Sequence, residues 1–339
     1  QAWVDGEAGG KDFWYHNRGE MRRFWLGTQM TIRDAFKVHY LMLLQNDRTP
    51  ARGPRKIGYQ SAFSAYVEWD LNKSFSNLGG GNWTIGYGKR CLPLNEEECD
   101  SSKVMPVVER SAISNRLFIL TSGGSSPLGA WVRHSSGPWK SFFGLYSTDT
   151  APDWGNWDDG FAWIAQVERD MAAEFGTDAA LLSAAFYYND TKRGDDMLSG
   201  GLNWAASAWT VIEEGPWTFR ANLIFAEADS TNALQDGALW GFVGTVQREL
   251  IEDKLEAVAR YHYQGSQNPQ GIRMYSRYAR MAGLPQNEAI PALAAGRGDE
   301  QHALYLGLNW KICNHNIKLM SGVEWERLSS GSTEVYEGV

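Results

Sequence analysis

The sequence predicts an all-β fold, a transmembrane antiparallel β-barrel of about sixteen strands, with residues 1–339 in a single domain. Three observations predict it. Apolar and polar residues alternate with a period of two, the connections between these segments are short and long in turn, and aromatic residues and glycine are abundant in a chain that is only 43% hydrophobic. Together they indicate strands with one apolar and one polar face, as in a wall between lipid and water.

The alternation is clear over residues 255–264. Leu255, Tyr261 and Tyr263 fall on an apolar face, whereas Arg260 falls on a mostly polar one. Because successive side chains of a strand point to opposite sides, the two faces meet different environments. Several apolar faces end in Trp or Tyr, which is typical of the aromatic girdles at the two membrane interfaces.

Segments of this kind predict about sixteen strands, most of them near the roughly 9–11 residues that a tilted strand needs to cross a bilayer. The expected ranges are 1–5, 21–32, 35–44, 61–71, 83–91, 128–135, 139–148, 161–171, 180–189, 200–212, 217–228, 238–250, 255–265, 302–312, 317–328 and a start near 335. A closed barrel pairs its last strand with its first, so we expect the two terminal strands to be incomplete in this sequence.

The connections alternate in length along the chain. Long ones fall at 6–20, 45–60, 92–127, 149–160, 190–199, 229–237 and 266–301, and short ones at 33–34, 136–138, 213–216, 251–254 and 313–316. Two connections of intermediate length, 72–82 and 172–179, fall on the side of the short ones. Outer-membrane barrels have short periplasmic turns at one rim and longer extracellular loops at the other. A soluble sandwich has no reason to show this alternation.

Several classes of protein are disfavoured. No run approaches the 18 apolar residues that indicate a membrane-spanning helix, and a net charge of −8 argues against nucleic acid as a partner. No HExxH, GxSxG or phosphate-loop pattern accompanies the six histidines, so we expect neither an enzyme nor a cofactor or metal. The alternative from another class is a soluble carbohydrate-binding β-sandwich, which the 16 tryptophans favour.

The three cysteines are Cys91, Cys99 and Cys313, and none has a CxxC spacing. One interpretation makes them plain structural thiols. The other is a Cys91–Cys99 disulfide that closes a short loop in an oxidising compartment and leaves Cys313 without a partner.

Two stretches resemble a known family. Residues 22–40 read RRFWLGTQMTIRDAFKVHY, and within residues 84–116 a strand ending in Gly88-Lys89 is followed by a proline, an acidic run, a Ser-Ser pair and Glu109-Arg110-Ser111. Both stretches are similar to the phosphate-selective porin O/P family of bacterial outer-membrane porins. Over the rest of the chain the likeness is one of strand order and spacing.

The resemblance implies a homotrimeric sixteen-stranded barrel whose third extracellular loop, residues 92–127 here, folds inward and narrows the lumen. It implies passive diffusion of small hydrophilic solutes or ions with an anion or phosphate preference, and contact with outer-membrane lipid and lipopolysaccharide. By position, Arg22, Arg23 and Arg110 would attract the anion. The strand phase points Arg23 inward and Arg22 outward or at the rim.

Basic and acidic residues are both expected along the pore, and this mixture of charges favours general diffusion of small solutes over phosphate selectivity. The candidate anion-binding residues are Arg22, Arg23, Lys103, Arg110, Arg116, Arg133, Arg220 and Arg260. The acidic residues of the narrowing loop are Glu96, Glu97, Glu98, Asp100 and Glu109, and the inferred lumen adds Glu68, Asp70, Glu168, Glu256, Glu324 and Glu326.

Two interpretations of the inward basic residues remain open. They form a ladder that guides anions, or they pair with inward carboxylates. If the protein is a porin narrowed by the loop 92–127, Arg110→Glu in that loop should shift its selectivity toward cations. The strand phase predicts that Arg260→Ala is mild beside Tyr261→Arg.

Overall fold

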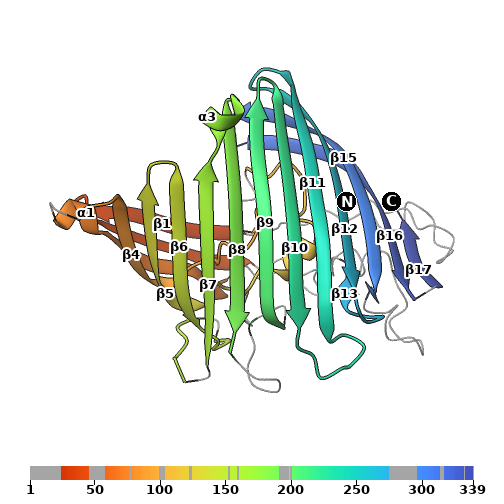
Figure 1. The fold of residues 1–339 in the computed structure, drawn as a ribbon, viewed down its shortest axis with the longest axis horizontal. Helices are drawn as coiled ribbons and strands as arrows, with labels where there is room; N and C mark the ends of the chain where they lie inside the picture. Colours follow the sequence, from red (N-terminus) through yellow and green to blue (C-terminus); the bar gives the residue numbers. More distant parts are fainter. Residues whose placement is uncertain are drawn as a thin grey trace.

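The computed structural model describes residues 24–45, 58–75, 78–98, 104–121, 124–151, 153–158, 160–190, 198, 201–274, 296–313, 317–331 and 333–338. Fifteen strands form one antiparallel sheet in chain order, and two short strands, β13 and β14, form a separate two-stranded sheet (Figure 1). The strands are β1 Phe24–Ile32, β2 Phe36–Gln45, β3 Ser61–Asp70, β4 Asn82–Lys89, β5 Leu128–Ser136, β6 Trp139–Ser147, β7 Phe161–Asp170, β8 Ala179–Asn189, β9 Leu202–Glu214, β10 Trp217–Ala228, β11 Gly237–Ile251, β12 Leu255–Ser266, β13 Ile272–Arg273, β14 Arg297–Gly298, β15 Glu300–Cys313, β16 Ile317–Ser330 and β17 Thr333–Gly338.

The all-β prediction is confirmed. Each described strand of the large sheet corresponds to one expected from the alternation. The ends agree to within two residues except at the start of the expected strand 21–32, whose residues 21–23 lie outside the described residues. The expected strand at 1–5 lies outside the described residues.

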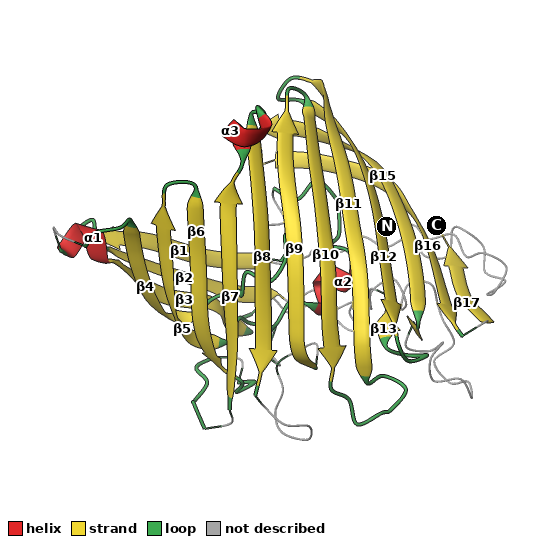
Figure 2. Ribbon diagram, viewed as in Figure 1, coloured by secondary structure: helices red, strands yellow, loops and turns green. Residues whose placement is uncertain are grey.

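The long and short connections lie at opposite rims of the sheet. The tight turns at the turn rim include Gly137 and Gly215, whose φ angles of 54° and 53° suit glycine. Two short helices, α1 Leu71–Ser74 and α3 Ala172–Phe175, also lie at this rim (Figure 1). None of the described helices is long and apolar enough to cross a membrane. The long connections lie at the other end of the strands, which we call the loop rim (Figure 2).

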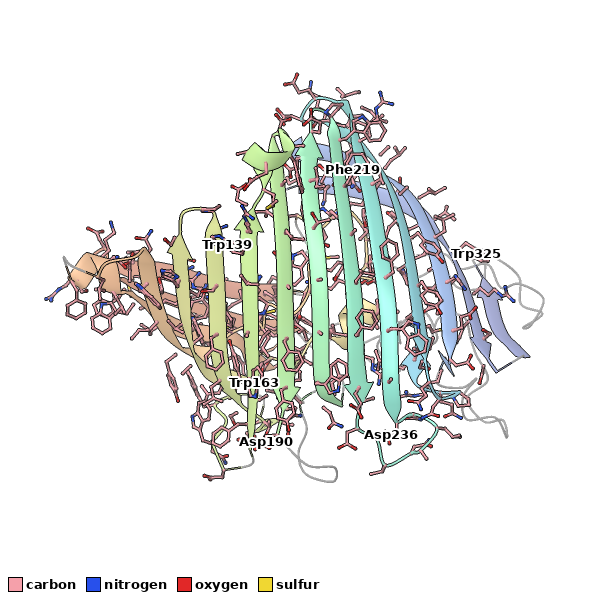
Figure 3. The ribbon with its side chains drawn as sticks, viewed as in Figure 1. Trp139, Trp163, Asp190, Phe219, Asp236 and Trp325 are labelled. Carbon is pink, nitrogen blue, oxygen red and sulfur yellow. The ribbon has the colours of Figure 1, made fainter. Side chains whose placement is uncertain are left out.

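The outward face of the sheet is apolar. On β16 the side chains of Leu319 and Val323 are 62% and 59% exposed, whereas Glu326 on the other face is 1% exposed. Figure 3 places Trp139 and Phe219 toward the turn rim and Trp163 toward the loop rim. Rings near both ends of the strands agree with the two aromatic girdles expected of a membrane barrel.

The sheet curves around part of the segment 92–127, which contains helix α2, Ala112–Arg116 (Figure 2). We call this segment the constriction loop. Its side chains Leu94, Ile113 and Leu117 are fully buried and join a cluster with inward-facing Ile164 and Ile224 of the strands. The inward face is therefore less uniformly polar than the alternation suggested, because the apolar side of the loop packs on it.

Candidate functional site

The constriction loop is tied to the inner face of the sheet by Arg260 on β12. Its Nη1 lies 3.1 Å from Glu97 Oε1 and donates to the backbone oxygen of Glu109 at 2.6 Å. Its Nη2 lies 2.9 Å from Glu324 Oε1 on β16. The guanidinium is 1% exposed, so it joins two strands and the loop away from bulk water.

Further contacts reach the loop from neighbouring strands. Arg220 on β10 forms an ion pair with Glu96. Asn309 on β15 donates to the backbone oxygen of Pro106 at 2.7 Å, and Lys318 on β16 donates to that of Met105 at 2.6 Å. Inward polar groups of β10, β12, β15 and β16 thus hold the loop against the wall.

Arg110 is buried inside the constriction loop. Its Nε donates to Glu97 O at 2.6 Å and its Nη2 to Glu98 O at 3.2 Å, while the guanidinium lies 5.0 Å from the ring centroid of Phe118. An arginine expected to meet passing anions instead holds the loop backbone together, because its donors match carbonyls of the chain some twelve residues earlier.

The loop carboxylates are also internal. Burial would raise the pKa of Glu97, but Arg260 and hydrogen bonds from the backbone and hydroxyl of Ser111 outweigh it and lower that pKa. Burial raises the pKa of Glu98 well above its ordinary value, although the amides of Ile119 and Leu94 donate to it. Neither side chain forms an exposed acidic ring in the pore.

Arg133 belongs to a second group of charges on the wall, centred on Glu68 of β3. The Glu68 carboxylate lies 2.8 Å from Arg133 Nη2 on β5 and 4.0 Å from Lys37 Nζ on β2, and it also pairs with Arg90. Trp131 Nε1 donates to it at 3.1 Å. Across β2 to β5, positive charges therefore converge on one buried carboxylate.

Some expected site residues lie outside the described residues: Arg22, Arg23, Cys99, Asp100 and Lys103. Cys91 is disulfide-bonded, and Cys313 is an exposed free thiol.

Arg116 lies in a different setting, a cavity of about 450 Å³ near the loop rim. The walls come from the end of α2, the end of β10 and the two-stranded sheet of β13 and β14. Arg273 and Arg297 line the cavity with Arg116, and Asp229 is the acidic residue among its described lining side chains. We call this cavity the arginine pocket.

The pocket has a strongly positive field. Burial, together with the positive charges of Arg297 and Arg273, lowers the pKa of Arg116 to about 9, and burial with Arg273 lowers the pKa of Arg297 to about 10. Arg116 and Arg297 remain cationic at neutral pH. Their guanidinium groups donate to the backbone oxygens of Gly271 and Gln270, which fixes their position. Preorganised guanidinium groups in a concave site suit a carboxylate or phosphate.

Two of the three pocket arginines were missed at the sequence level. Arg273 and Arg297 lie in the connection 266–301, which contains four arginines and three acidic residues. A net charge of +1 is too weak a signal to mark the connection as an anion site. Its convergence with Arg116 could not be inferred, because more than 150 residues of sequence separate Arg116 from Arg273.

No protein-family model matches the chain. No curated protein matches it either.

Solved structures do match. The outer membrane channel DcaP of Acinetobacter baumannii is 14% identical, with a TM-score of 0.52, over 99% of this chain and 90% of that one. OprB of Pseudomonas putida is 10% identical, with a TM-score of 0.55, over 89% of this chain and 80% of that one. At these identities the likeness concerns the fold. Together with the apolar outward face, it identifies the fold as that of a bacterial outer-membrane β-barrel.

Proposed function

We propose that the protein is an outer-membrane porin for passive diffusion of small hydrophilic solutes, with a preference for anions that arises in the arginine pocket. The fold supports the general part of the proposal. The soluble β-sandwich alternative is wrong, because one continuous sheet of fifteen strands carries an apolar outward face.

The arginine pocket is the observation that carries the anion preference. Arg116, Arg273 and Arg297 line one cavity, where the positive charges of its neighbours help to lower the pKa of Arg116. On the wall, Arg133 and Arg260 instead lie beside the carboxylates of Glu68 and Glu97. An anion pore concentrates positive charge where the solute passes. A solute with a carboxylate or phosphate group would find matching donors in the pocket. The proposed selectivity site therefore differs from Arg110, the loop arginine that the resemblance implied.

The partners are part of the proposal. A homotrimer in contact with outer-membrane lipid and lipopolysaccharide, as the resemblance implies, stays a prediction. A heat-modifiable oligomer on a gel and chemical crosslinking in detergent would test the trimer directly.

The test is the reversal potential of single channels under a potassium chloride gradient, followed by titration of the chloride current with inorganic phosphate. We expect an anion-selective potential and a current that phosphate reduces. Arg273→Gln should raise the half-blocking phosphate concentration roughly tenfold or more, because a hydrogen bond to a charged group contributes about 1.5–3 kcal/mol.

Arg248→Gln is the matched control. Arg248 is exposed on the outward face of β11, over the ring of Trp217, so its loss should leave both measurements unchanged. Channels that conduct without selectivity, or phosphate block that Arg273→Gln does not weaken, would leave general diffusion as the function. Failure of the purified, folded protein to form channels would contradict the porin itself.

A further inference from the structure

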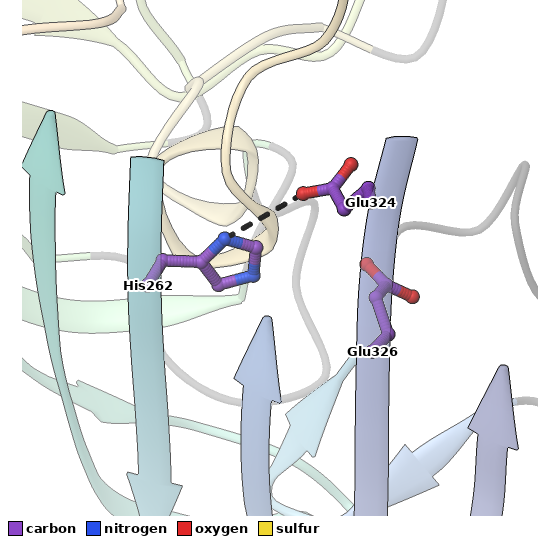
Figure 4. A group of neighbouring side chains, drawn as sticks. All are labelled: His262, Glu324 and Glu326. Atoms are coloured by element: carbon purple, nitrogen blue, oxygen red, sulfur yellow. Dashed lines mark ion pairs between the residues drawn. The ribbon is translucent and has the colours of Figure 1, made fainter. Parts of the chain in front are cut away.

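A histidine and two glutamates meet on the inner face of the sheet, away from the arginine pocket. His262 is on β12, and Glu324 and Glu326 are on β16 (Figure 4). One ligand atom from each residue can be chosen so that all three lie within 4.8 Å of one another. His262 Nδ1 lies 3.9 Å from Glu324 Oε1.

The sheet register brings these residues together across an intervening strand. His262 is opposite Ala303 of β15, and Ala303 is in turn opposite Glu326. Strands are spaced about 4.8 Å apart, so His262 and Glu326 lie about two spacings apart along this row. The small side chain of Ala303, itself fully buried, leaves the space over β15 into which both longer side chains lean.

The cluster has buried polar atoms that no protein group satisfies. His262 and Glu326 are each 1% exposed. Within the described part of the chain, neither ring nitrogen of His262 and neither carboxylate oxygen of Glu326 has a hydrogen-bond partner. A buried polar atom without a hydrogen-bond partner destabilises the folded protein by about 1–3 kcal/mol, and by more when it is charged. Four such atoms around one space therefore indicate a ligand-binding site.

The charges of the surrounding side chains favour a cation. Arg260 pairs with both Glu97 and Glu324, whereas Glu326 has no ion pair among the described residues. When ionised, Glu97, Glu324 and Glu326 carry three negative charges against the one positive charge of Arg260. A divalent cation would neutralise the excess of this group, which is otherwise buried at high cost.

The donor set narrows the kind of cation. Imidazole nitrogen binds zinc and other transition metals, whereas calcium and magnesium prefer sites made of oxygen atoms alone. Ligand atoms of a tetrahedral zinc ion are roughly 3.3 Å apart, so ligand atoms that lie within 4.8 Å of one another would need to approach by up to about 1.5 Å. The hydrogen bond from Arg260 to Glu324 is the kind of outer contact that orients a metal-binding carboxylate.

We propose that His262, Glu324 and Glu326 bind a divalent first-row transition-metal ion on the inner wall of the barrel, with Zn²⁺ as the probe. The ion links β12 to β16 across β15. Because Glu324 also pairs with Arg260, the bound ion is connected through that arginine to the constriction loop. The proposal is independent of the anion preference.

The experiment uses the whole protein, purified in detergent, stripped with EDTA and titrated with zinc chloride by calorimetry. We expect one Zn²⁺ per chain and an unfolding temperature that rises with zinc concentration. Glu326→Gln, which keeps the side-chain shape, should weaken binding by more than about 100-fold, since even an outer-shell partner contributes roughly 10- to 100-fold. Circular dichroism checks that this variant folds.

His302→Ala is the control. His302 lies near Glu300 and is paired with Tyr263 of β12, which faces outward, so His302 is on the opposite face of the sheet from the cluster. It should bind Zn²⁺ as the parent does. Cobalt offers a second readout: Co²⁺ at the site should give a visible absorption band that Glu326→Gln abolishes. Absence of stoichiometric Zn²⁺ binding, or binding that Glu326→Gln leaves intact, would overturn the proposal.

Discussion

The arginines of the barrel wall and those of the arginine pocket differ in what surrounds them. On the wall, Arg260 and Arg133 each lie within 3.1 Å of a buried carboxylate oxygen. In the pocket, Arg116 and Arg297 have positive neighbours and donate to backbone carbonyls. The same residue type therefore fastens the structure in one region and creates a positive field in the other, and an inward-facing arginine does not by itself indicate selectivity.

The largest effect should come from Arg260→Ala. Its removal leaves buried Glu97 and Glu324 without this guanidinium, and breaking a buried ion pair costs about 3–5 kcal/mol. The mild effect expected from the strand phase alone is thus revised. Unfolding in denaturant should show the loss, and single channels should become noisier as the loop loosens. Lys140→Ala, which removes an exposed partner of Glu168, should cost less than about 1 kcal/mol.

An arginine introduced at position 261 of β12, next to Arg260, tests the outward face of the sheet. Tyr261 points away from the loop and lies near the middle of β12, so Tyr261→Arg should destabilise the barrel by about 2–4 kcal/mol. Leu255→Arg, at the turn rim, should cost only about 0–1 kcal/mol. Unfolding in lipid vesicles measures both variants, and equal losses would contradict the assigned depth of these positions.

The pocket and the wall can be compared directly by charge removal. Arg297→Gln should weaken phosphate block roughly tenfold, as a lost hydrogen bond to a charged group predicts. Arg133→Gln should change it little, because Lys37 and Arg90 still face Glu68. Phosphate titration of the chloride current checks both variants. A larger effect at position 133 would mean that the wall, not the pocket, selects the solute.

The smallest effect expected is a pH dependence of the constriction loop. The pKa of Glu97 is lowered from 4.5, so its stabilising contribution is present above that value and is lost as the pH falls through the lowered pKa. The raised pKa of Glu98 acts in the opposite sense, and its contribution is lost as the pH rises through that pKa. Current noise should therefore increase on strong acidification.

Glu97→Gln serves as the control for the acid effect. This variant no longer carries a proton-dependent charge at position 97, so acidification should add no further noise. An unchanged acid response would assign the effect to other carboxylates.

The strands and their faces could be predicted from the sequence. A period-two pattern is local, so residues 255–264 suffice to place Arg260 and His262 on one side and Tyr261 on the other. The alternation of turn and loop lengths is local as well, and it assigned the segment 92–127 to the loop rim. Arg116 was a candidate from its position in that segment.

The partners of these side chains were decided only by the tertiary structure. Glu97 meets Arg260 across 163 positions of sequence, and His262 meets Glu326 because Ala303 lies between them in the register. Strand phase specifies which side of a sheet a residue faces, but not which residue of a folded loop or of a strand two places away lies opposite. The sequence determined the barrel wall and its inward charges, whereas the folding of the loop onto that wall decided which charges meet on the wall and which gather in the arginine pocket.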